Sequence, residues 1–395
     1  MKETTRAVRE LLGGDAVCVL SAFSAMQQSR DGAGPFLQEA NFLWLTGIDE
    51  PGWRCIITQD TFYLVAPDRS DVHRVFDGGF SNDEVLSRSG ADEVISSTDA
   101  AVLLDRLAES FEIVYTLTDD PHASHYDFIL NPEPGVLMEE LRDIFKDVRD
   151  CRLELAKVRA IKNPDELRLM RDAVLLTSRA FDAVKEKVAS GSCTQEYEVE
   201  ALFTYEMRRH GAQGHAYEPI VAGGKNALTL HYSKNNDPLP KNGLVLMDIG
   251  ARIGGYAADI TRTFAIGTPS AREKEVHAAV EAAHRKIISL IKPGVSLKDY
   301  QNQSDDIMKQ ALEQLGLLSE PSDLRKYFPH AISHGLGIDV HESLGGHSTF
   351  QPGMVLTVEP GIYIPEEGIG VRIEDDILVT SEGNENLSAH LSTGM

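Results

Sequence analysis

The sequence predicts an α+β protein in which a smaller α/β domain precedes a larger domain built from two similar halves. Short strand-like and helix-like runs alternate up to about residue 150, and beyond that point a long helix, a second helix and strands with acidic residues follow one another twice. A chain of 395 residues is long enough for two domains, whose cores need no disulfide bonds.

The N-terminal region is expected to be an α/β domain. Strand-like runs occupy residues 16–21, 55–58, 61–66 and 112–116, and helix-like runs occupy residues 101–111 and 135–148. No catalytic motif is found in this region. We therefore predict an N-terminal domain over residues 1–152 and a second domain, which carries the chemistry, over residues 153–395.

The second domain repeats itself in outline. Asn163 and Ser270 are typical N-cap residues at the starts of two long helices, and each of these is followed by a shorter helix. The shorter helices end at Gly211 and Gly316, which lie 105 residues apart. The side-chain identities do not repeat, so the pattern indicates a structural pseudo-repeat. Two similar halves that face each other would bring their acidic strands to one central site.

Two pairs of acidic residues lie on these strands. Asp248 would oppose Asp259 if the chain turns at residues 253–254, and Glu359 would oppose Glu374 if it turns at residues 366–367. Because side chains alternate between faces with a period of two, each pair then projects from one face of its hairpin. Like charges that face each other across strands are destabilising. Four carboxylates on apolar strands therefore predict a compensating charge, and a pair of divalent metal ions is the simplest one.

Histidines complete the predicted site. His334 is the best candidate for a fifth ligand, and His330, His341 and His347 crowd the same segment, where His347 is better explained as a loop residue. Carboxylate-rich ligation with one imidazole suits Mn²⁺, Co²⁺ or Zn²⁺. His231, expected at a strand end before the first acidic hairpin, has the pKa range needed to pass a proton to a leaving nitrogen.

Composition and charge exclude several classes of partner. The formal net charge of −23 argues against nucleic acid and against anionic membranes as binding partners. No apolar stretch is long enough to cross a bilayer or to serve as a secretory signal. The four cysteines are widely spaced and form no CxxC motif, so we expect reduced thiols in a cytoplasmic protein.

Five motifs of the second domain resemble the pita-bread metallopeptidases, in particular Xaa-Pro aminopeptidases (aminopeptidase P) and Xaa-Pro dipeptidases (prolidases). The motifs follow one another in family order over roughly residues 155–390, and they are HYSKNN, LVLMDIGARIGGYAADITRTF, HAISHGLGIDVHE, GMVLTVEPGIYI and GVRIEDD. QEANFLWLTGIDEPG is similar to the start of the smaller N-terminal domain of that family. The resemblance implies a C-terminal pita-bread (creatinase/aminopeptidase) fold with pseudo-twofold halves.

The resemblance also implies a set of ligands. Asp248 would chelate one metal ion, Asp259 and Glu374 would bridge two ions, and His334 and Glu359 would complete the two coordination spheres. The ions would be divalent, Mn²⁺ first and Co²⁺ or Zn²⁺ as options. A hydroxide that bridges them would attack the scissile carbonyl, because coordination lowers the pKa of water.

Further roles follow from the same resemblance. Glu359 would also accept the proton of the attacking water. His231 and His341 would stabilise the tetrahedral intermediate and help to protonate the leaving proline nitrogen. The residues that would shape or polarise the substrate site are His330, Tyr363 and Arg372. Arg372 lies two residues before Glu374, so a purely structural ion pair is its alternative role.

The implied substrates are proline-containing peptides, and the implied assembly is a homodimer or homotetramer. HYSKNN and its surroundings favour the aminopeptidase over the dipeptidase, which stays the main alternative. The short loop between Glu359 and Glu374 leaves no room for an inserted specificity element, so substrate length stays open. A non-catalytic peptide-binding domain and a methionine aminopeptidase are more remote alternatives.

Overall fold

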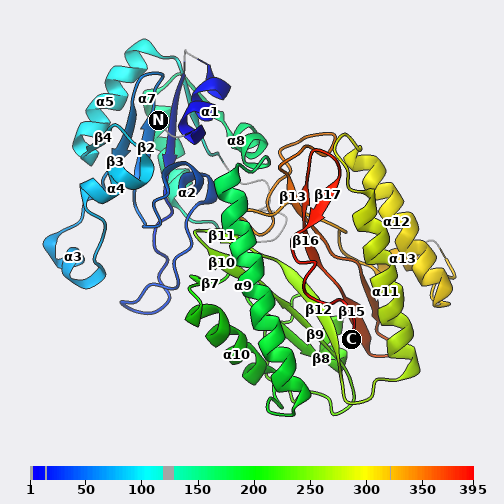
Figure 1. Ribbon diagram of the computed structural model, residues 1–395. Helices are drawn as coiled ribbons and strands as arrows, with labels where there is room; N and C mark the ends of the chain where they lie inside the picture. Colours follow the sequence, from blue (N-terminus) through cyan, green and yellow to red (C-terminus); the bar gives the residue numbers. More distant parts are fainter. Residues whose placement is uncertain (1–2, 14–15, 119–128, 321) are drawn as a thin grey trace. The chain divides into compact units, whose positions relative to one another are not determined.

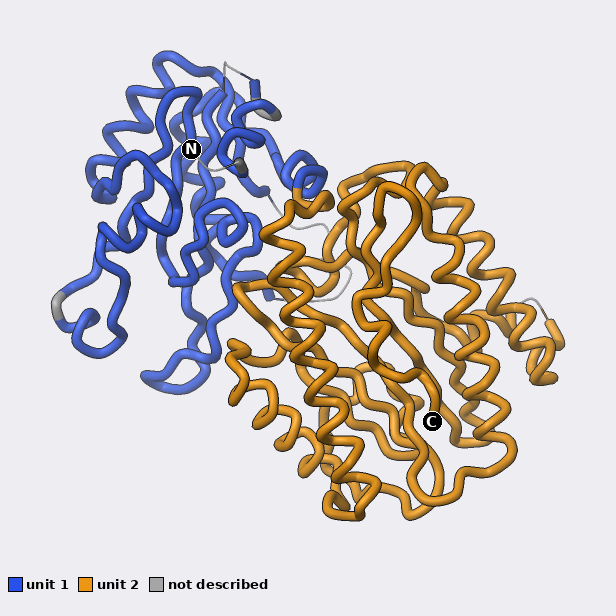
Figure 2. The backbone as a smooth tube through the Cα atoms, in the orientation of Figure 1, with its two compact units in different colours: residues 1–158 blue, residues 159–395 orange. Residues whose placement is uncertain are grey.

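The computed structural model describes residues 3–13, 16–118, 129–320 and 322–395 (Figure 1). The chain forms two compact units, Met1–Val158 (unit 1) and Arg159–Met395 (unit 2), which Figure 2 colours separately. The sequence places the boundary between residues 152 and 153, within the first turn of the helix α8 (Arg152–Arg159). This helix begins in unit 1, because Arg152 donates a hydrogen bond of 2.8 Å to the carbonyl of Thr118.

Unit 1 is a six-stranded mixed sheet with helices. The strand order is β4-β3-β2-β1-β5-β6, with β1–β2 and β2–β3 antiparallel and the other pairs parallel. The strands are β1 (Ala16–Ser21), β2 (Arg54–Ile57), β3 (Phe62–Val65), β4 (Glu93–Ile95), β5 (Ile113–Thr116) and β6 (Asp147–Asp150). The other helices are α1 (Glu3–Leu12), α2 (Ala40–Thr46), α3 (Asp71–Asp77), α4 (Asn82–Ser89), α5 (Ser97–Ser110) and α7 (Glu133–Ile144). The expected α/β alternation is confirmed.

The core of unit 1 lies between its sheet and the helices α5 and α7. Val17, Ile56 and Val114 from three strands pack with Leu104 of α5 and Leu141 of α7. Burying side chains of this kind contributes roughly 1.5–3 kcal/mol each.

All four cysteines lie in the described part of the chain, and all four are free thiols. Cys18, Cys55 and Cys151 are buried, and burial raises the pKa of the Cys55 thiol to about 12. Cys193 is partly exposed and lies between the first two helices of unit 2.

Unit 2 repeats one series of elements. The first half contains α9 (Pro164–Ala189), α10 (Glu196–Arg209), β7 (Gly214–His215), β8 (Ile220–Gly223), the 3₁₀ helix η1 (Gly224–Leu228), β9 (Gly243–Ile249), β10 (Ala251–Ile253), β11 (Tyr256–Ala257) and β12 (Ile260–Ile266). The second contains α11 (Ala271–Leu290), α12 (Leu297–Gln314), α13 (Asp323–Tyr327), β13 (Val355–Val358), β14 (Gly361–Ile364), β15 (Ile369–Arg372), β16 (Asp375–Val379) and β17 (Asn384–Asn386). The strands lie between α9–α10 and α11–α13 (Figure 1).

The long helices begin where the sequence predicts. The Asn163 side chain accepts hydrogen bonds from the N–H groups of Asp165 and Glu166, and the Glu166 carboxylate accepts one from the N–H of Asn163. Ser270 and Glu273 form the same capping box at the start of α11. Each box satisfies N–H groups that the helix itself leaves unpaired.

The register of the first acidic hairpin differs from the prediction by two residues. β9 and β12 are antiparallel, and Asp248 lies opposite Thr261 rather than Asp259. The chain turns at Gly254 and Gly255, whose φ angles of 56° and 87° suit glycine, so the turn falls one residue later than expected. A shift of two residues keeps both aspartates on the predicted face of the hairpin.

The second hairpin has the predicted register. Val358 pairs with Asp375 and Gly361 pairs with Arg372, so Glu359 and Glu374 lie opposite each other between these two pairs. Gly368 closes the turn with a φ of 67°. The two acidic residues therefore occupy the break between β13–β16 and β14–β15.

A buried arginine joins the two halves of unit 2. Arg262 of β12 is 1% exposed and donates hydrogen bonds of 2.6 Å to the Asp375 carboxylate and to the Glu374 carbonyl. The Thr263 hydroxyl donates to the Arg372 carbonyl at 2.9 Å, and the N–H of Glu374 donates to the Thr261 carbonyl at 3.0 Å. These bonds fix β12 of the first half against β15 and β16 of the second.

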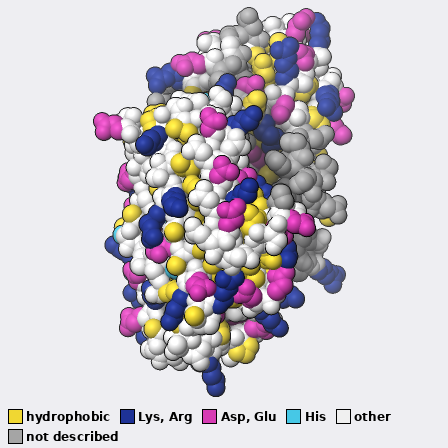
Figure 3. All heavy atoms as spheres, turned by 90° about the vertical axis from the view of Figure 1, so that its right-hand side faces the viewer, with side chains coloured by type: hydrophobic (Ala, Val, Ile, Leu, Met, Phe, Trp, Pro, Cys, Tyr) yellow, Lys and Arg dark blue, Asp and Glu magenta, His cyan; other side chains and the backbone are white. Residues whose placement is uncertain are grey.

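Among the described residues, no helix is both long and apolar enough to cross a membrane. On the face shown in Figure 3, acidic and basic side chains are interspersed.

Candidate metal centre

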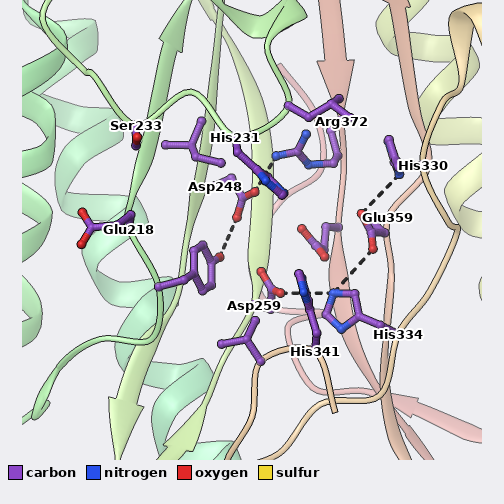
Figure 4. Close-up of a pocket in the computed structure, with 15 residues that line it drawn as sticks. Glu218, His231, Ser233, Asp248, Asp259, His330, His334, His341, Glu359 and Arg372 are labelled. Carbon is purple, nitrogen blue, oxygen red and sulfur yellow. Dashed lines mark hydrogen bonds and ion pairs between the residues drawn. The ribbon is translucent and has the colours of Figure 1, made fainter. Parts of the chain in front are cut away.

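A pocket of about 400 Å³ lies within unit 2, and acidic and histidine side chains surround it (Figure 4). Nine of the ten residues predicted for the site line it, namely His231, Asp248, Asp259, His330, His334, His341, Glu359, Arg372 and Glu374. The remaining predicted residue, Tyr363, is buried and contacts two of these residues. The structure therefore gathers residues that span more than 140 positions of the sequence, from 231 to 374.

Three of the predicted ligands form a compact cluster. Asp259, His334 and Glu374 each offer one ligand atom, and these atoms all lie within 4.8 Å of one another. The His334 Nε2 atom lies 3.5 Å from the Asp259 carboxylate and 3.6 Å from the Glu359 carboxylate. His334 also orients its ring, since its Nδ1 lies 3.0 Å from the Gly335 carbonyl and so carries the hydrogen. Nε2 is therefore left free to bind a cation.

The carboxylates of this cluster repel one another. Burial raises the pKa of Asp259 well above its usual range, and the nearby Asp248 and Asp376 raise it further. Burial and the neighbouring Asp259 likewise raise the pKa of Glu374, and burial raises the pKa of Glu359 to about 8. A cation in the cluster would remove this penalty, because it stabilises the charged carboxylates.

The imidazole of His334 supports the same conclusion. Burial and the nearby His341 lower the pKa of His334 to about 4. The ring is therefore neutral at pH 7, which is the form that binds metal. A neutral imidazole among three carboxylates is a donor set that suits a divalent transition metal ion.

Asp248, the fourth acidic residue, is held by two other side chains. Its carboxylate accepts hydrogen bonds from the Arg372 guanidinium at 2.5 Å and from the Tyr217 hydroxyl at 2.6 Å. Arg372 also donates to the Thr261 hydroxyl at 3.1 Å, and Thr261 donates to the Glu374 carboxylate at 2.6 Å. A continuous chain of hydrogen bonds thus connects the two acidic hairpins. Arg372 is the positively charged residue in this chain of hydrogen bonds.

The predicted substrate residues form a second chain of contacts. The Tyr363 hydroxyl accepts a hydrogen bond of 2.8 Å from Arg372 and lies 3.0 Å from the His330 Nε2 atom. The His330 Nδ1 atom lies 3.4 Å from Glu359. Burial lowers the pKa of His330 to about 4, so its ring is neutral. His330 and Arg372 line the pocket together with Glu359, and Tyr363 contacts both of them without lining it.

His231 and His341 both line the pocket and are both exposed. The His341 ring centroid lies 4.4 Å from that of His334. The sequence predicts His231 at a strand end. In the structure His231 lies instead in the turn that follows η1. Two histidines that solvent can reach beside a cluster of carboxylates are suited to proton transfer. His347 is not among the residues that line the pocket.

Three residues that support the site are not predicted from the sequence. Tyr217 and Thr261 hold the carboxylates of Asp248 and Glu374, and the buried Asp376 accepts the Asp259 N–H at 3.1 Å. Thr261 and Asp376 each follow a predicted ligand by two residues, so strand alternation could have indicated them. Tyr217 has no such signal in the sequence.

Comparisons with known proteins find matches to both units of the chain. A model of metallopeptidase family M24 matches residues 168–381, and a model of the aminopeptidase P N-terminal domain matches residues 2–115. The chain is 34% identical over 406 residues to Xaa-Pro aminopeptidase 3 of Mus musculus, an alignment that covers 95% of this chain and 79% of that protein. It is 31% identical to the Xaa-Pro aminopeptidase of Haemophilus influenzae, with 98% and 92% covered.

A solved structure shows the same architecture. The structure of aminopeptidase P from E. coli with the inhibitor Pro-Leu has a TM-score of 0.86 and 28% sequence identity, and the match covers 99% of this chain and 95% of that chain.

Proposed function

Since this chain belongs to metallopeptidase family M24, we propose that it is an Xaa-Pro aminopeptidase that uses two divalent metal ions to hydrolyse the first bond of peptides with proline second. Its fold is the predicted pita-bread fold preceded by a smaller α/β domain. The observation that carries the proposal is the cluster of Asp259, His334 and Glu374, whose ligand atoms lie within 4.8 Å of one another in a pocket lined by further histidines.

We propose that the ions are held by Asp248, Asp259, His334, Glu359 and Glu374, with Mn²⁺ as the first candidate. When bound, they would lower the pKa of water so that hydroxide is available as the nucleophile at neutral pH. Glu359 lies 3.6 Å from the His334 Nε2 atom, and burial raises its pKa to about 8. A carboxylate in that position is suited to accept the proton of the attacking water.

The remaining pocket residues handle the substrate. His231 and His341 stand at the exposed side of the cluster, where either can donate a hydrogen bond to the developing oxyanion or a proton to the leaving nitrogen. His330 and Arg372 line the pocket, and the Tyr363 hydroxyl holds both of them, because it accepts a hydrogen bond of 2.8 Å from the Arg372 guanidinium and lies 3.0 Å from the His330 Nε2 atom. We propose that His330 and Arg372 contact the peptide and that Tyr363 shapes this part of the substrate site.

Selectivity for proline has a physical reason. An Xaa-Pro bond has no N–H, so a site that recognises that donor rejects it. A pocket shaped around the proline ring can accept it. The leaving group is then a secondary amine, and its departure requires protonation, which the exposed histidines can provide.

Peptide hydrolysis by the metal-loaded protein tests the proposal. The protein is stripped with a chelator, reloaded with Mn²⁺, Co²⁺ or Zn²⁺, and given an Xaa-Pro-Xaa tripeptide, an Xaa-Pro dipeptide and an Xaa-Ala-Xaa tripeptide, with products measured by mass spectrometry. We expect metal-dependent release of the first residue from the Xaa-Pro tripeptide. Hydrolysis of the dipeptide alone would make the protein an Xaa-Pro dipeptidase, and equal hydrolysis of the alanine peptide would refute the proline selectivity.

We further propose a cytoplasmic homodimer or homotetramer. Four free thiols, three of them buried, fit a reducing compartment. Val75 and Phe76 of α3 are 83% and 82% exposed, and their burial against a second copy would be favourable. Light scattering of the purified protein measures its mass, and a monomer at micromolar concentration would contradict the proposed assembly.

A further inference from the structure

A buried carboxylate that the proposed reaction does not use lies at the start of α10. Glu196 is 0% exposed, and both of its oxygens accept hydrogen bonds. Oε1 accepts from the Gly223 N–H at 2.8 Å and from the Asn226 side chain at 3.0 Å. Oε2 accepts from the Tyr232 hydroxyl at 2.9 Å and from the Asp237 N–H at 3.0 Å.

The four hydrogen-bond donors of the Glu196 carboxylate are all uncharged groups. Among the described residues, no lysine or arginine forms an ion pair with Glu196, so neutral donors alone compensate for its burial. An ionised carboxylate in a buried position is costly unless its oxygens are fully hydrogen-bonded. Because four donors converge on it, removal of the charge would loosen every segment that supplies one of them.

The four donors come from both sides of His231. Gly223 and Asn226 precede this histidine, and Tyr232 and Asp237 follow it, so Glu196 closes the loop of residues 223–237 at both ends. The Tyr232 ring, next in sequence to His231, also packs against the apolar cluster of Ile220, Ala222, Ala227 and Leu246. The loop is therefore held by one carboxylate on its polar side and by a small apolar cluster under Tyr232.

A second buried residue fixes the same loop. Asn235 is 1% exposed and has a φ of 44°, a left-handed conformation that is uncommon for residues other than glycine. Its side chain accepts the Val221 N–H at 2.9 Å and donates to the Pro219 carbonyl at 2.8 Å and to the Glu200 carboxylate at 2.9 Å. Two adjacent turns of α10 thus bind the loop through Glu196 and Glu200. The loop is built to be rigid, whereas its His231 side chain is exposed to the pocket.

We propose that Glu196 is a positioning residue, which fixes the loop of residues 223–237 and so holds His231 at the metal centre. This inference rests on the proposed function, because it assigns Glu196 a role in the reaction through His231. Glu196 itself does not line the pocket. A displacement of about 1 Å in a reacting group can lower the rate by roughly 100-fold.

Glu196→Gln is the first test. The glutamine keeps the shape but replaces one acceptor oxygen with an NH₂ group, which faces two of the four donors. We expect kcat for an Xaa-Pro tripeptide to fall by about tenfold to 100-fold with little change in KM. Tyr232→Phe removes one donor and keeps the ring, so it should give a smaller fall in the same direction, and it tests the inference if Glu196→Gln does not fold.

A double-mutant comparison separates positioning from a merely structural role. If Glu196 acts through His231, Glu196→Gln should cost less than about twofold when His231→Ala is already present. Equal losses in both backgrounds would overturn the inference. Glu206→Gln is the matched control, because Glu206 lies on the same helix and, within the described part of the chain, forms ion pairs with its helix neighbours Arg209 and His210 alone. It should leave kcat unchanged.

Hydrogen exchange of the metal-free protein gives a readout that does not depend on activity. Amides of residues 223–237 should exchange faster in Glu196→Gln than in the wild type or in Glu206→Gln. If the wild type does not hydrolyse Xaa-Pro peptides, the proposed function fails, while the exchange result still decides whether Glu196 holds the loop. If the wild type is active and Glu196→Gln matches it in kcat and in exchange, only the positioning inference fails.

Discussion

Glu359 should make the stability of the metal-free protein depend on pH, and the direction follows from its surroundings. Burial raises the pKa of Glu359 to about 8, whereas a glutamate in the unfolded chain has a pKa of 4.5. Between these values the folded state binds more protons than the unfolded state, so the free energy of unfolding falls as the pH rises. Each pH unit corresponds to about 1.36 kcal/mol, so the full effect of Glu359 is roughly 5 kcal/mol.

Two histidines act in the opposite direction at lower pH. Burial lowers the pKa values of His330 and His334 from 6.5 to about 4, so the unfolded state binds more protons between these values and stability rises with pH. Above pH 6.5 this contribution is complete. Between pH 6.5 and 8 the raised pKa values of buried carboxylates therefore set the slope, and the contribution of Glu359 to the fall in the free energy of unfolding should be roughly 2 kcal/mol. Asp259 and Glu374, whose pKa values burial also raises, act in the same direction.

Urea unfolding in the presence of a chelator measures this fall. Glu359→Gln cannot ionise, so its curve should fall less than that of the wild type between pH 6.5 and 8. Glu366→Gln, at the tip of the same hairpin, should retain the wild-type fall, because the hydrogen bond from Lys326 lowers the pKa of Glu366 below this range. Addition of Mn²⁺ at pH 8 should restore stability in the wild type. Parallel curves for the wild type and Glu359→Gln would refute the reasoning.

Three further predictions concern the centre and its support. Arg262→Met removes the arginine that pairs with the buried Asp375, and it should lower the free energy of unfolding in urea by about 3–5 kcal/mol. The control Arg285→Met, at a side chain that is 63% exposed, should change this free energy by less than about 1 kcal/mol. Asp259→Asn should abolish calorimetric binding of Mn²⁺ and hydrolysis of Xaa-Pro peptides together, and retention of either would remove Asp259 from the ligand set. Gly250→Ala would bring a Cβ atom to 1.7 Å from a backbone carbonyl and should lower the melting temperature by many degrees, whereas Gly383→Ala, which meets nothing within 4 Å, should melt close to the wild type.

The second acidic hairpin could be predicted to the residue because its turn is simple. The strand pattern around Glu359 and Glu374 fixes the register once a single four-residue turn is assumed, and Gly368 fits that turn. The first hairpin has two adjacent glycines, and the sequence does not say which pair of residues occupies the turn. The register of Asp248 was therefore wrong by two residues, although its face was predicted.

Contacts that depend on long-range packing could not be predicted from the sequence. Tyr217 lies 31 residues before Asp248, and nothing in the local pattern connects them. His231 lies in a turn rather than at a strand end, and the loop around it is hydrogen-bonded to Glu196 of α10, 35 positions earlier in the sequence. Alternation along a strand indicates which side chains share a face, but it does not indicate which loop covers that face.

The uneven exposure of the cysteines makes the molecule easy to label. Cys193 is the partly exposed thiol, and the other three lie in the interior of unit 1 or at its edge with almost no accessible surface. A maleimide dye at mildly alkaline pH should therefore attach to a single position without any engineering. That position is three residues before Glu196, so the fluorescence of the dye would report on the start of α10 while peptides and metal ions are added.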